Sequence, residues 1–148
     1  MSQRFDVAAV SPDAYKAMLA LSAASKGGLD EALLELVKIR ASQLNACAFC
    51  LNMHIDAARR LGVSERRLHL LAVWREAPVF DARERAALAW AEALTRLTGG
   101  DVPDDVYEEA RRHFSEAELS ALSFAVVVIN GWNRLMIASR TPPKLTED

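Results

Sequence analysis

The sequence predicts an all-α fold, and three observations support that prediction. Apolar residues recur at the spacing of amphipathic helices along most of the 148 residues. The six glycines and five prolines are few and fall between these periodic segments. No run of five or more residues alternates convincingly between apolar and polar side chains, as a half-buried strand would.

The first half of the chain predicts three helices. Residues 11–13 (SPD) place an N-cap serine before a proline at the first helical position, and the pair Gly27-Gly28 ends that helix. A second helix is expected over residues 29–44. Asn45 is predicted to cap a third helix, which ends near residues 61–62.

Three shorter segments follow. A short helix is expected to start at residues 64–65 and to reach about Trp74. Residues 81–97 place alanine, leucine and tryptophan on one face with charges opposite, and residues 98–100 (TGG) stop that helix. Pro103 opens another helix that ends near His113.

The last predicted helix begins with a capping box. Ser115 and Glu118 have the spacing of that motif. The run ALSFAVVVI over residues 121–129 is apolar on every side, which predicts a helix enclosed by others, and residues 141–143 (TPP) end it.

Length and composition indicate one soluble domain over residues 1–148, with a short N-terminal extension (1–10) and a C-terminal tail (141–148). The net charge of −2 offers no basic excess for nucleic acid. The most apolar stretch, residues 121–129, is too short to span a bilayer, and the N-terminus has no long apolar run. We expect a cytoplasmic protein that binds neither nucleic acid nor membrane.

Residues 47–54, CAFCLNMH, contain both cysteines of the chain and one of its three histidines. A disulfide between cysteines three positions apart would close a tiny loop and stabilise little. Such a bridge is therefore expected to serve redox chemistry and not to be a structural cross-link.

With about 3.6 residues per turn, one stripe of the third helix is expected to face inward: Cys47, Cys50, His54, Ala57, Ala58 and Leu61. A lone cysteine or histidine on such a face is usually a packing residue. Three together at the start of one helix favour a functional site instead.

Each cysteine is predicted to have its own activating group. If Asn45 is the cap, Cys47 lies in the first turn, where free N–H groups and the helix dipole favour a thiolate. His54 follows Cys50 by four residues, so its imidazole can lie beside that sulfur and exchange a proton with it. The i, i+3 spacing lets one sulfur attack the other after oxidation.

A zinc site is the alternative interpretation of these residues. The pattern C-x-x-C-x-x-x-H supplies three ligands, whereas a structural zinc site takes four. His69 or His113 would have to fold back to complete the set. We therefore predict neither a metal nor another bound cofactor.

One motif of this chain consists of Glu35 and, further along, residues 42–45 (SQLN), Cys47, Cys50 and His54, in the spacing SQLN-x-C-x-x-C-x-x-x-H. This motif resembles the AhpD-like alkylhydroperoxidase group of the carboxymuconolactone decarboxylase family. Three later segments also resemble that group: residues 74–77 (WREA), 85–92 (RAALAWAE) and 130–134 (NGWNR). The resemblance spans about residues 29–138 and implies an AhpD-like helical bundle, assembled as a homotrimer or homohexamer.

The resemblance also implies a function and a site. It implies a thiol peroxidase in which Cys50 attacks the hydroperoxide, Cys47 resolves the product, and His54 and Glu35 belong to the proton relay. A dithiol reductant, a lipoylated or thioredoxin-like protein, would reopen the disulfide. The best-known members have a relay histidine between the cysteines, where this chain has Phe49.

Other polar residues admit plainer interpretations. Periodicity alone makes Glu35 a solvated partner of Lys38. Arg40 lies within an apolar stripe, which predicts a buried carboxylate or an interface beside it. Asn130, Asn133 and Arg134 form a polar face, best explained as satisfying helix ends and otherwise as a substrate or subunit contact. The three tryptophans are expected in the core or at interfaces.

Two alternative functions remain open. A carboxymuconolactone decarboxylase-type lyase would not rely on a cysteine pair. A thiol sensor that reacts once per reduction would use the same cysteines without sustained turnover.

Overall fold

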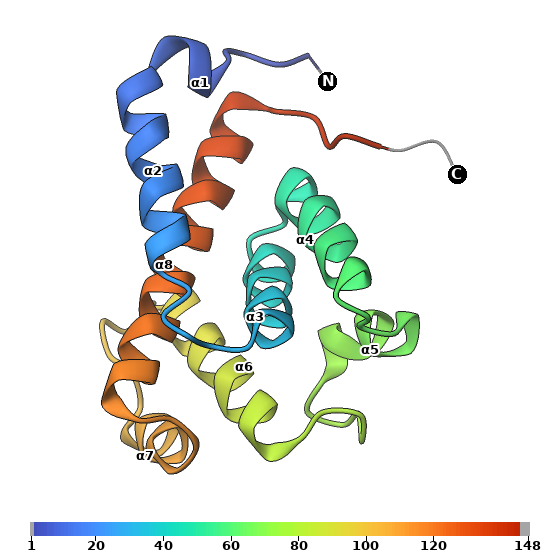
Figure 1. The fold of residues 1–148 in the computed structure, drawn as a ribbon, viewed down its shortest axis with the longest axis vertical. Coiled ribbons are helices and arrows are strands. Elements are labelled where there is room, and N and C mark those ends of the chain that lie inside the picture. Colours follow the sequence, from blue (N-terminus) through green and yellow to red (C-terminus); the bar gives the residue numbers. More distant parts are fainter. Residues whose placement is uncertain (1, 146–148) are drawn as a thin grey trace.

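The structure, a computed structural model, describes residues 2–145, and every regular element in that range is a helix (Figure 1). The predicted all-α class is confirmed. The elements are, in order, α1 (Val7–Val10), α2 (Pro12–Ala24), α3 (Glu31–Leu44), α4 (Ala48–Arg60), α5 (Glu65–Leu70), the 3-10 helix η1 (Leu71–Val73), α6 (Ala82–Thr95), α7 (Asp104–His113) and α8 (Glu116–Ser139).

Side-chain caps set most of the helix starts. Ser115 and Glu118 form the predicted capping box of α8, and Asp81 forms a second one with Glu84 at the start of α6. The Asp30 carboxylate accepts from the N–H of Leu33, so α3 starts two residues later than expected.

The N-terminal segment contains a helix that the sequence analysis did not predict. The carboxylate of Asp6 accepts hydrogen bonds from the N–H groups of Ala8 and Ala9 and so caps α1. Only four residues are helical before Ser11. One turn is too short for periodicity to reveal it.

Helix α3 is the centre of the bundle. It packs against α4, α6 and α8, and Figure 1 shows it between α8 on one side and α4 on the other. Leu36, Val37 and Ile39 are fully buried. Burial of each such side chain contributes roughly 1.5–3 kcal/mol relative to exposure. This packing fixes the central helix from which the candidate site residue Glu35 projects.

Helix α8 differs from its prediction in one respect. It was expected to be enclosed by other helices, but Phe124 and Val127 are 51% and 59% exposed. With 24 residues, α8 alone in the described chain is long and apolar enough to cross a membrane by length and composition. It nevertheless packs against α3 and α6 and carries the fully buried Asn133. A core helix with one uncovered apolar face explains these features.

The buried carboxylate predicted beside Arg40 is Glu92 on α6. Glu92 accepts from Arg40 Nε at 2.7 Å, Trp74 Nε1 at 2.9 Å and Arg75 Nη1 at 2.6 Å. Burial raises the pKa of Glu92, but these donors outweigh it and the net pKa is lower than usual. Glu92 therefore joins α3, η1 and α6 as an ionised, hydrogen-bonded carboxylate.

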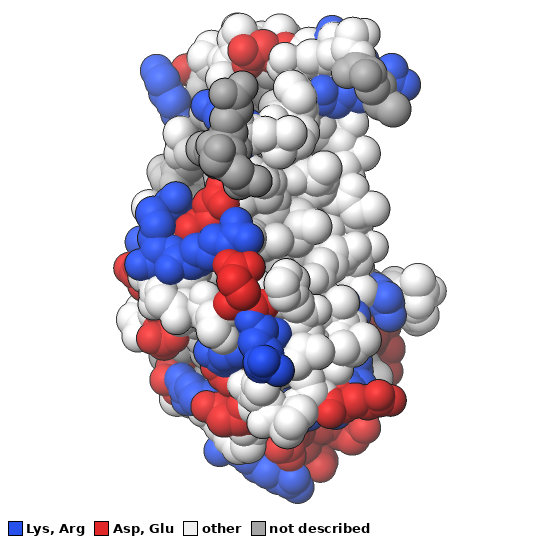
Figure 2. All heavy atoms as spheres, turned by 90° about the vertical axis from the view of Figure 1, so that its right-hand side faces the viewer, with Lys and Arg blue, Asp and Glu red and all other residues white. Residues whose placement is uncertain are grey.

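Figure 2 views the molecule from the side of α4 and α5. Acidic and basic side chains are interspersed along one edge and at one end, and a broad area beside them carries no charge. No extended basic surface of the kind that tracks phosphates is visible on this face.

Candidate active site

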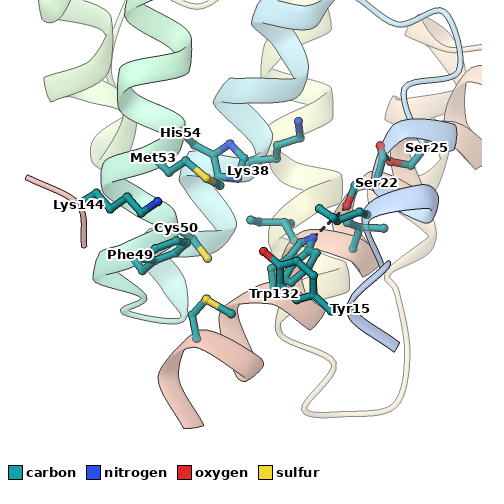
Figure 3. A pocket seen from close by; sticks show the side chains of 14 residues that line it. Tyr15, Ser22, Ser25, Lys38, Phe49, Cys50, Met53, His54, Trp132 and Lys144 are labelled. Atoms are coloured by element: carbon teal, nitrogen blue, oxygen red, sulfur yellow. Dashed lines mark hydrogen bonds between the residues drawn. The ribbon is translucent and has the colours of Figure 1, made fainter. Parts of the chain in front are cut away.

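A cavity of about 370 Å³ lies among α2, α3, α4 and α8, close to the C-terminal tail (Figure 3). Most of its wall is apolar or aromatic, with contributions from Tyr15, Leu19, Phe49, Met53, Trp132 and Met136. The Tyr15 and Trp132 rings meet edge to face, with centroids 5.2 Å apart. Cys50 and His54 line the same cavity, so the sequence motif opens onto a space that can hold a small apolar molecule.

The start of α4 differs from the prediction. Asn45 does not cap α4; it is the C-cap of α3, and its side chain turns to α8. Ala46 takes a left-handed conformation with φ of 56°, and Cys47 then occupies the N-cap position. Asparagine is common at both ends of helices, which is why its position in the sequence was ambiguous.

Cys47 and Cys50 are both free thiols, 1% and 0% exposed. The thiol of Cys50 hydrogen-bonds to the sulfur of Cys47, and this bond is the largest influence on both pKa values. It lowers the pKa of Cys47 to about 6, although burial acts to raise that pKa. The backbone N–H groups of Cys50 and Phe49 also lower it. The same bond, together with burial, raises the pKa of Cys50. Near neutral pH the pair therefore holds one proton and one negative charge.

His54 is held by Glu35 across the interface of α3 and α4. The Nδ1–H of His54 donates to Glu35 Oε2 at 2.6 Å, which leaves Nε2 as the basic nitrogen. Lys38 Nζ donates to Glu35 Oε1 at 2.8 Å. Burial raises the pKa of Glu35, but His54 and Lys38 outweigh it and the net pKa lies below the usual value. Glu35 thus orients the imidazole as an ionised carboxylate.

Two expectations for the motif need correction. Glu35 does pair with Lys38, but it is only 8% exposed and not solvated. Leu61, expected on the inward stripe, is 44% exposed. His54 lines the same cavity as Cys50, and among residues 2–145 its imidazole hydrogen-bonds to Glu35 and to neither sulfur.

Asn133 is a site residue that the sequence analysis underrated. Its Nδ2 donates to Ser42 Oγ at 3.0 Å, and its Oδ1 accepts from Asn45 Nδ2 at 2.9 Å. Its amide also lowers the pKa of Cys47 and of Cys50. Asn133 thus bonds to side chains near the end of α3, and not to the backbone groups of a helix end as predicted. The only sequence signal was a polar residue within the apolar α8.

Asn133→Ala is expected to lower the free energy of unfolding by about 1–3 kcal/mol, because Ser42 and Asn45 lose a buried partner. It is also expected to raise the pKa of Cys47. Urea denaturation and thiol titration measure the two effects. Ser120→Ala, on the exposed side of the same helix, is the control and should stay within about 0.5 kcal/mol of the parent. An unchanged unfolding midpoint in Asn133→Ala would contradict the assigned role.

The remaining histidines lie away from the cysteines. His69 on α5 is exposed and lies 3.9 Å from Glu65, and His113 on α7 pairs with Glu109 at 3.1 Å. In the part of the chain that the structure describes, no group of three or more His, Cys, Asp or Glu side chains is placed to hold a metal. Neither histidine folds back to complete a zinc site.

Comparison with known proteins places these residues in a family. Residues 12–93 match the model of the carboxymuconolactone decarboxylase family. The uncharacterized protein YdfG of Bacillus subtilis is 37% identical over 139 residues, which cover 93% of this chain and 95% of that protein.

Solved structures of similar proteins have the same fold. A protein of unknown function from Agrobacterium tumefaciens, suggested to be the antioxidant defence protein AhpD, is 39% identical with a TM-score of 0.94, covering 98% of this chain and 100% of that one. The AhpD core of a peroxidase-related protein from Ralstonia eutropha has the same fold at 22% identity, with a TM-score of 0.82 over 93% of this chain and 74% of that one.

Proposed function

The chain belongs to the carboxymuconolactone decarboxylase family, among its AhpD-like members, and from that premise we propose that it is a thiol peroxidase acting on organic hydroperoxides. One observation carries the proposal. Two free thiols lie in hydrogen-bond contact, and one of them, Cys50, lines an apolar cavity together with a histidine held by a carboxylate.

The first step consumes the hydroperoxide at Cys50. The proton of Cys50 passes to Cys47 along their hydrogen bond, which leaves a Cys50 thiolate facing the cavity. This thiolate attacks the terminal oxygen, so an S–O bond forms while the O–O bond breaks. The alkoxide takes the proton that Cys47 received, passed by way of His54 Nε2, and leaves as an alcohol, so that Cys47 is a thiolate again. Cys50 is oxidised to sulfenic acid, and the hydroperoxide is reduced.

The second step closes the disulfide. The Cys47 thiolate attacks the sulfur of Cys50; an S–S bond forms while the S–O bond breaks, and the hydroxide that leaves takes a proton from solvent to become water. An external dithiol, such as a lipoylated or thioredoxin-like protein, then supplies two electrons and two protons and becomes a disulfide itself. The pair returns to its starting state, and the protein requires no bound cofactor.

His54 and Glu35 serve as the proton relay in this scheme. Both His54 and the sulfur of Cys50 face the cavity, so a bound substrate would lie between them. Nε2 exchanges the proton with the departing alkoxide, and Glu35 stabilises the imidazolium whenever it forms. The side chain of Phe49, at the position of the family's relay histidine, contributes only apolar wall.

Cytoplasmic location and a homotrimeric or homohexameric assembly belong to the same proposal. Subunit contacts bury exposed apolar side chains, so an assembly is supported by those that stay uncovered on α8 and in the loop after α6: Phe124, Val127 and Leu97.

Steady-state turnover with dithiothreitol tests the proposed function against both alternatives. A peroxidase consumes many equivalents of cumene hydroperoxide per subunit. A sensor stops after one equivalent per reduction, and that outcome would replace the proposal. A lyase of the decarboxylase type would turn over a lactone acid even with both cysteines changed to serine.

Cys50→Ala is expected to raise the pKa of Cys47 from about 6 toward the ~8.5 of an ordinary cysteine, because the variant loses the thiol that donates to Cys47. Thiolate absorbance against pH measures this in a chain with one cysteine. Cys50→Ser retains a donor and is the matched control, with a pKa that stays lower than in Cys50→Ala. Equal values in the two variants would show that the hydrogen bond is not the cause.

A further inference from the structure

Two lysines line the cavity of Cys50, and no carboxylate residue does. Figure 3 shows Lys144, from the C-terminal tail, beside α4, and Lys38 projecting from α3. Most of the wall from α2 and α8 is formed by apolar and aromatic groups. The cavity therefore combines an apolar volume with positive charge at its edge.

The positive charge of Lys38 is already compensated. Its ammonium donates to Glu35 at 2.8 Å, and this pair is largely buried. Lys38 thus completes the Glu35–His54 relay and has little charge to offer a substrate.

Lys144 is different. Among residues 2–145, no Asp or Glu lies within ion-pair distance of its ammonium. Its backbone is nevertheless held in place, because Asn52 Nδ2 on α4 donates to the carbonyl oxygen of Lys144 at 2.9 Å. The tail is thereby positioned with its lysine side chain at the cavity wall.

The groups that most strongly shift the pKa of Cys47 and Cys50 are each other, nearby backbone and Asn133. The Lys144 ammonium, at the edge of an apolar cavity, is therefore available to a bound substrate.

We propose that Lys144 selects hydroperoxides that carry a carboxylate, so that the natural substrate class is the hydroperoxide of an amphipathic carboxylic acid, such as a fatty acid. This rests on the peroxidase function proposed above. The hydrocarbon part occupies the apolar cavity, and the carboxylate pairs with the Lys144 ammonium. The volume of about 370 Å³ lies at the lower end of the range of small-molecule sites, roughly 300–1,000 Å³.

The test compares a fatty acid hydroperoxide with its methyl ester, which differ in charge but not in hydrocarbon chain. The measured quantity is the ratio of kcat/KM for the acid to kcat/KM for the ester, with dithiothreitol as reductant. We expect the parent protein to prefer the acid roughly threefold to tenfold, as for one partly exposed ion pair. The preference should shrink as salt is raised, because salt screens such a pair.

Lys144→Gln should reduce the ratio to about one, whereas Lys26→Gln, which removes an exposed lysine on the loop after α2, should leave the ratio unchanged. A ratio near one in the parent protein, or a ratio that persists in Lys144→Gln, would overturn the inference.

A binding measurement separates this inference from the peroxidase function. Calorimetry with decanoate and methyl decanoate, neither of which can be reduced by the thiols, reports the carboxylate preference without turnover. If the protein consumes no hydroperoxide yet binds decanoate through Lys144, the peroxidase proposal fails and the ligand class stands. If it turns over hydroperoxides but binds acid and ester alike, the inference about Lys144 fails alone.

Discussion

Cys50→Ser is expected to reduce hydroperoxide consumption at least about a thousandfold, because the variant lacks the sulfur that faces the cavity. Cys47 does not take over, since it does not line that space. The measurement is single-turnover loss of cumene hydroperoxide, without added reductant. Comparable rates in the parent and in Cys50→Ser would contradict the assignment of the nucleophile.

Cys47→Ser is the matched control for that experiment. It retains Cys50 but lacks the second sulfur, so we expect it to react with one equivalent and to stop at sulfenic acid, which a sulfenic-acid-specific reagent traps. Sustained turnover with dithiothreitol should be lost in both variants. A stable sulfenic acid on Cys47 in Cys50→Ser would reverse the two roles.

Glu92→Gln is expected to lower the free energy of unfolding by about 3–5 kcal/mol, because it leaves the largely buried charge of Arg40 without its carboxylate. The indole N–H of Trp74 would also lose its ionised acceptor. The contribution of Arg75 is small, since its side chain is 60% exposed. Urea denaturation measures the change.

Glu116→Gln serves as the control for Glu92→Gln. Its side chain is 87% exposed and lies 3.9 Å from Arg111, so its substitution should change stability by no more than about 0.5 kcal/mol. Equal unfolding midpoints for the two variants would mean that the network around Glu92 does not hold α3, η1 and α6 together.

Much of the fold could be predicted from the sequence, because helix starts depend on local chemistry. Ser115 and Glu118 illustrate this: the capping box needs only residues three positions apart, and both bonds are present. Asn45 illustrates the limit. A shift of the helix start by two residues depends on the left-handed turn at Ala46, which no local propensity of alanine predicts.

Contacts distant in sequence were harder to predict. The pair of Glu35 with Lys38 is local and was predicted, whereas the bond between Glu35 and His54 joins residues 19 apart and depends on how α3 packs on α4. Only the family resemblance indicated it. The bond between Asn133 and Ser42, 91 residues apart, had no signal except polarity within an apolar helix.

The exposed face of α8 shows what composition cannot distinguish. Phe124 and Val127 lie in a run that is apolar on all sides, and such a run is equally compatible with burial in its own chain or against another copy. The periodicity of one sequence does not indicate whether other helices of the same chain or another copy of the chain cover this face.

The central claim is that the two sulfurs act together, and mass spectrometry of the reduced protein after one equivalent of hydroperoxide tests it most directly. The account predicts that one molecule of alcohol forms per subunit, that the chain loses two hydrogen atoms, and that peptide mapping finds Cys47 joined to Cys50. A protein that keeps both thiols, or that gains oxygen on Cys50 and never forms the bridge, would contradict it.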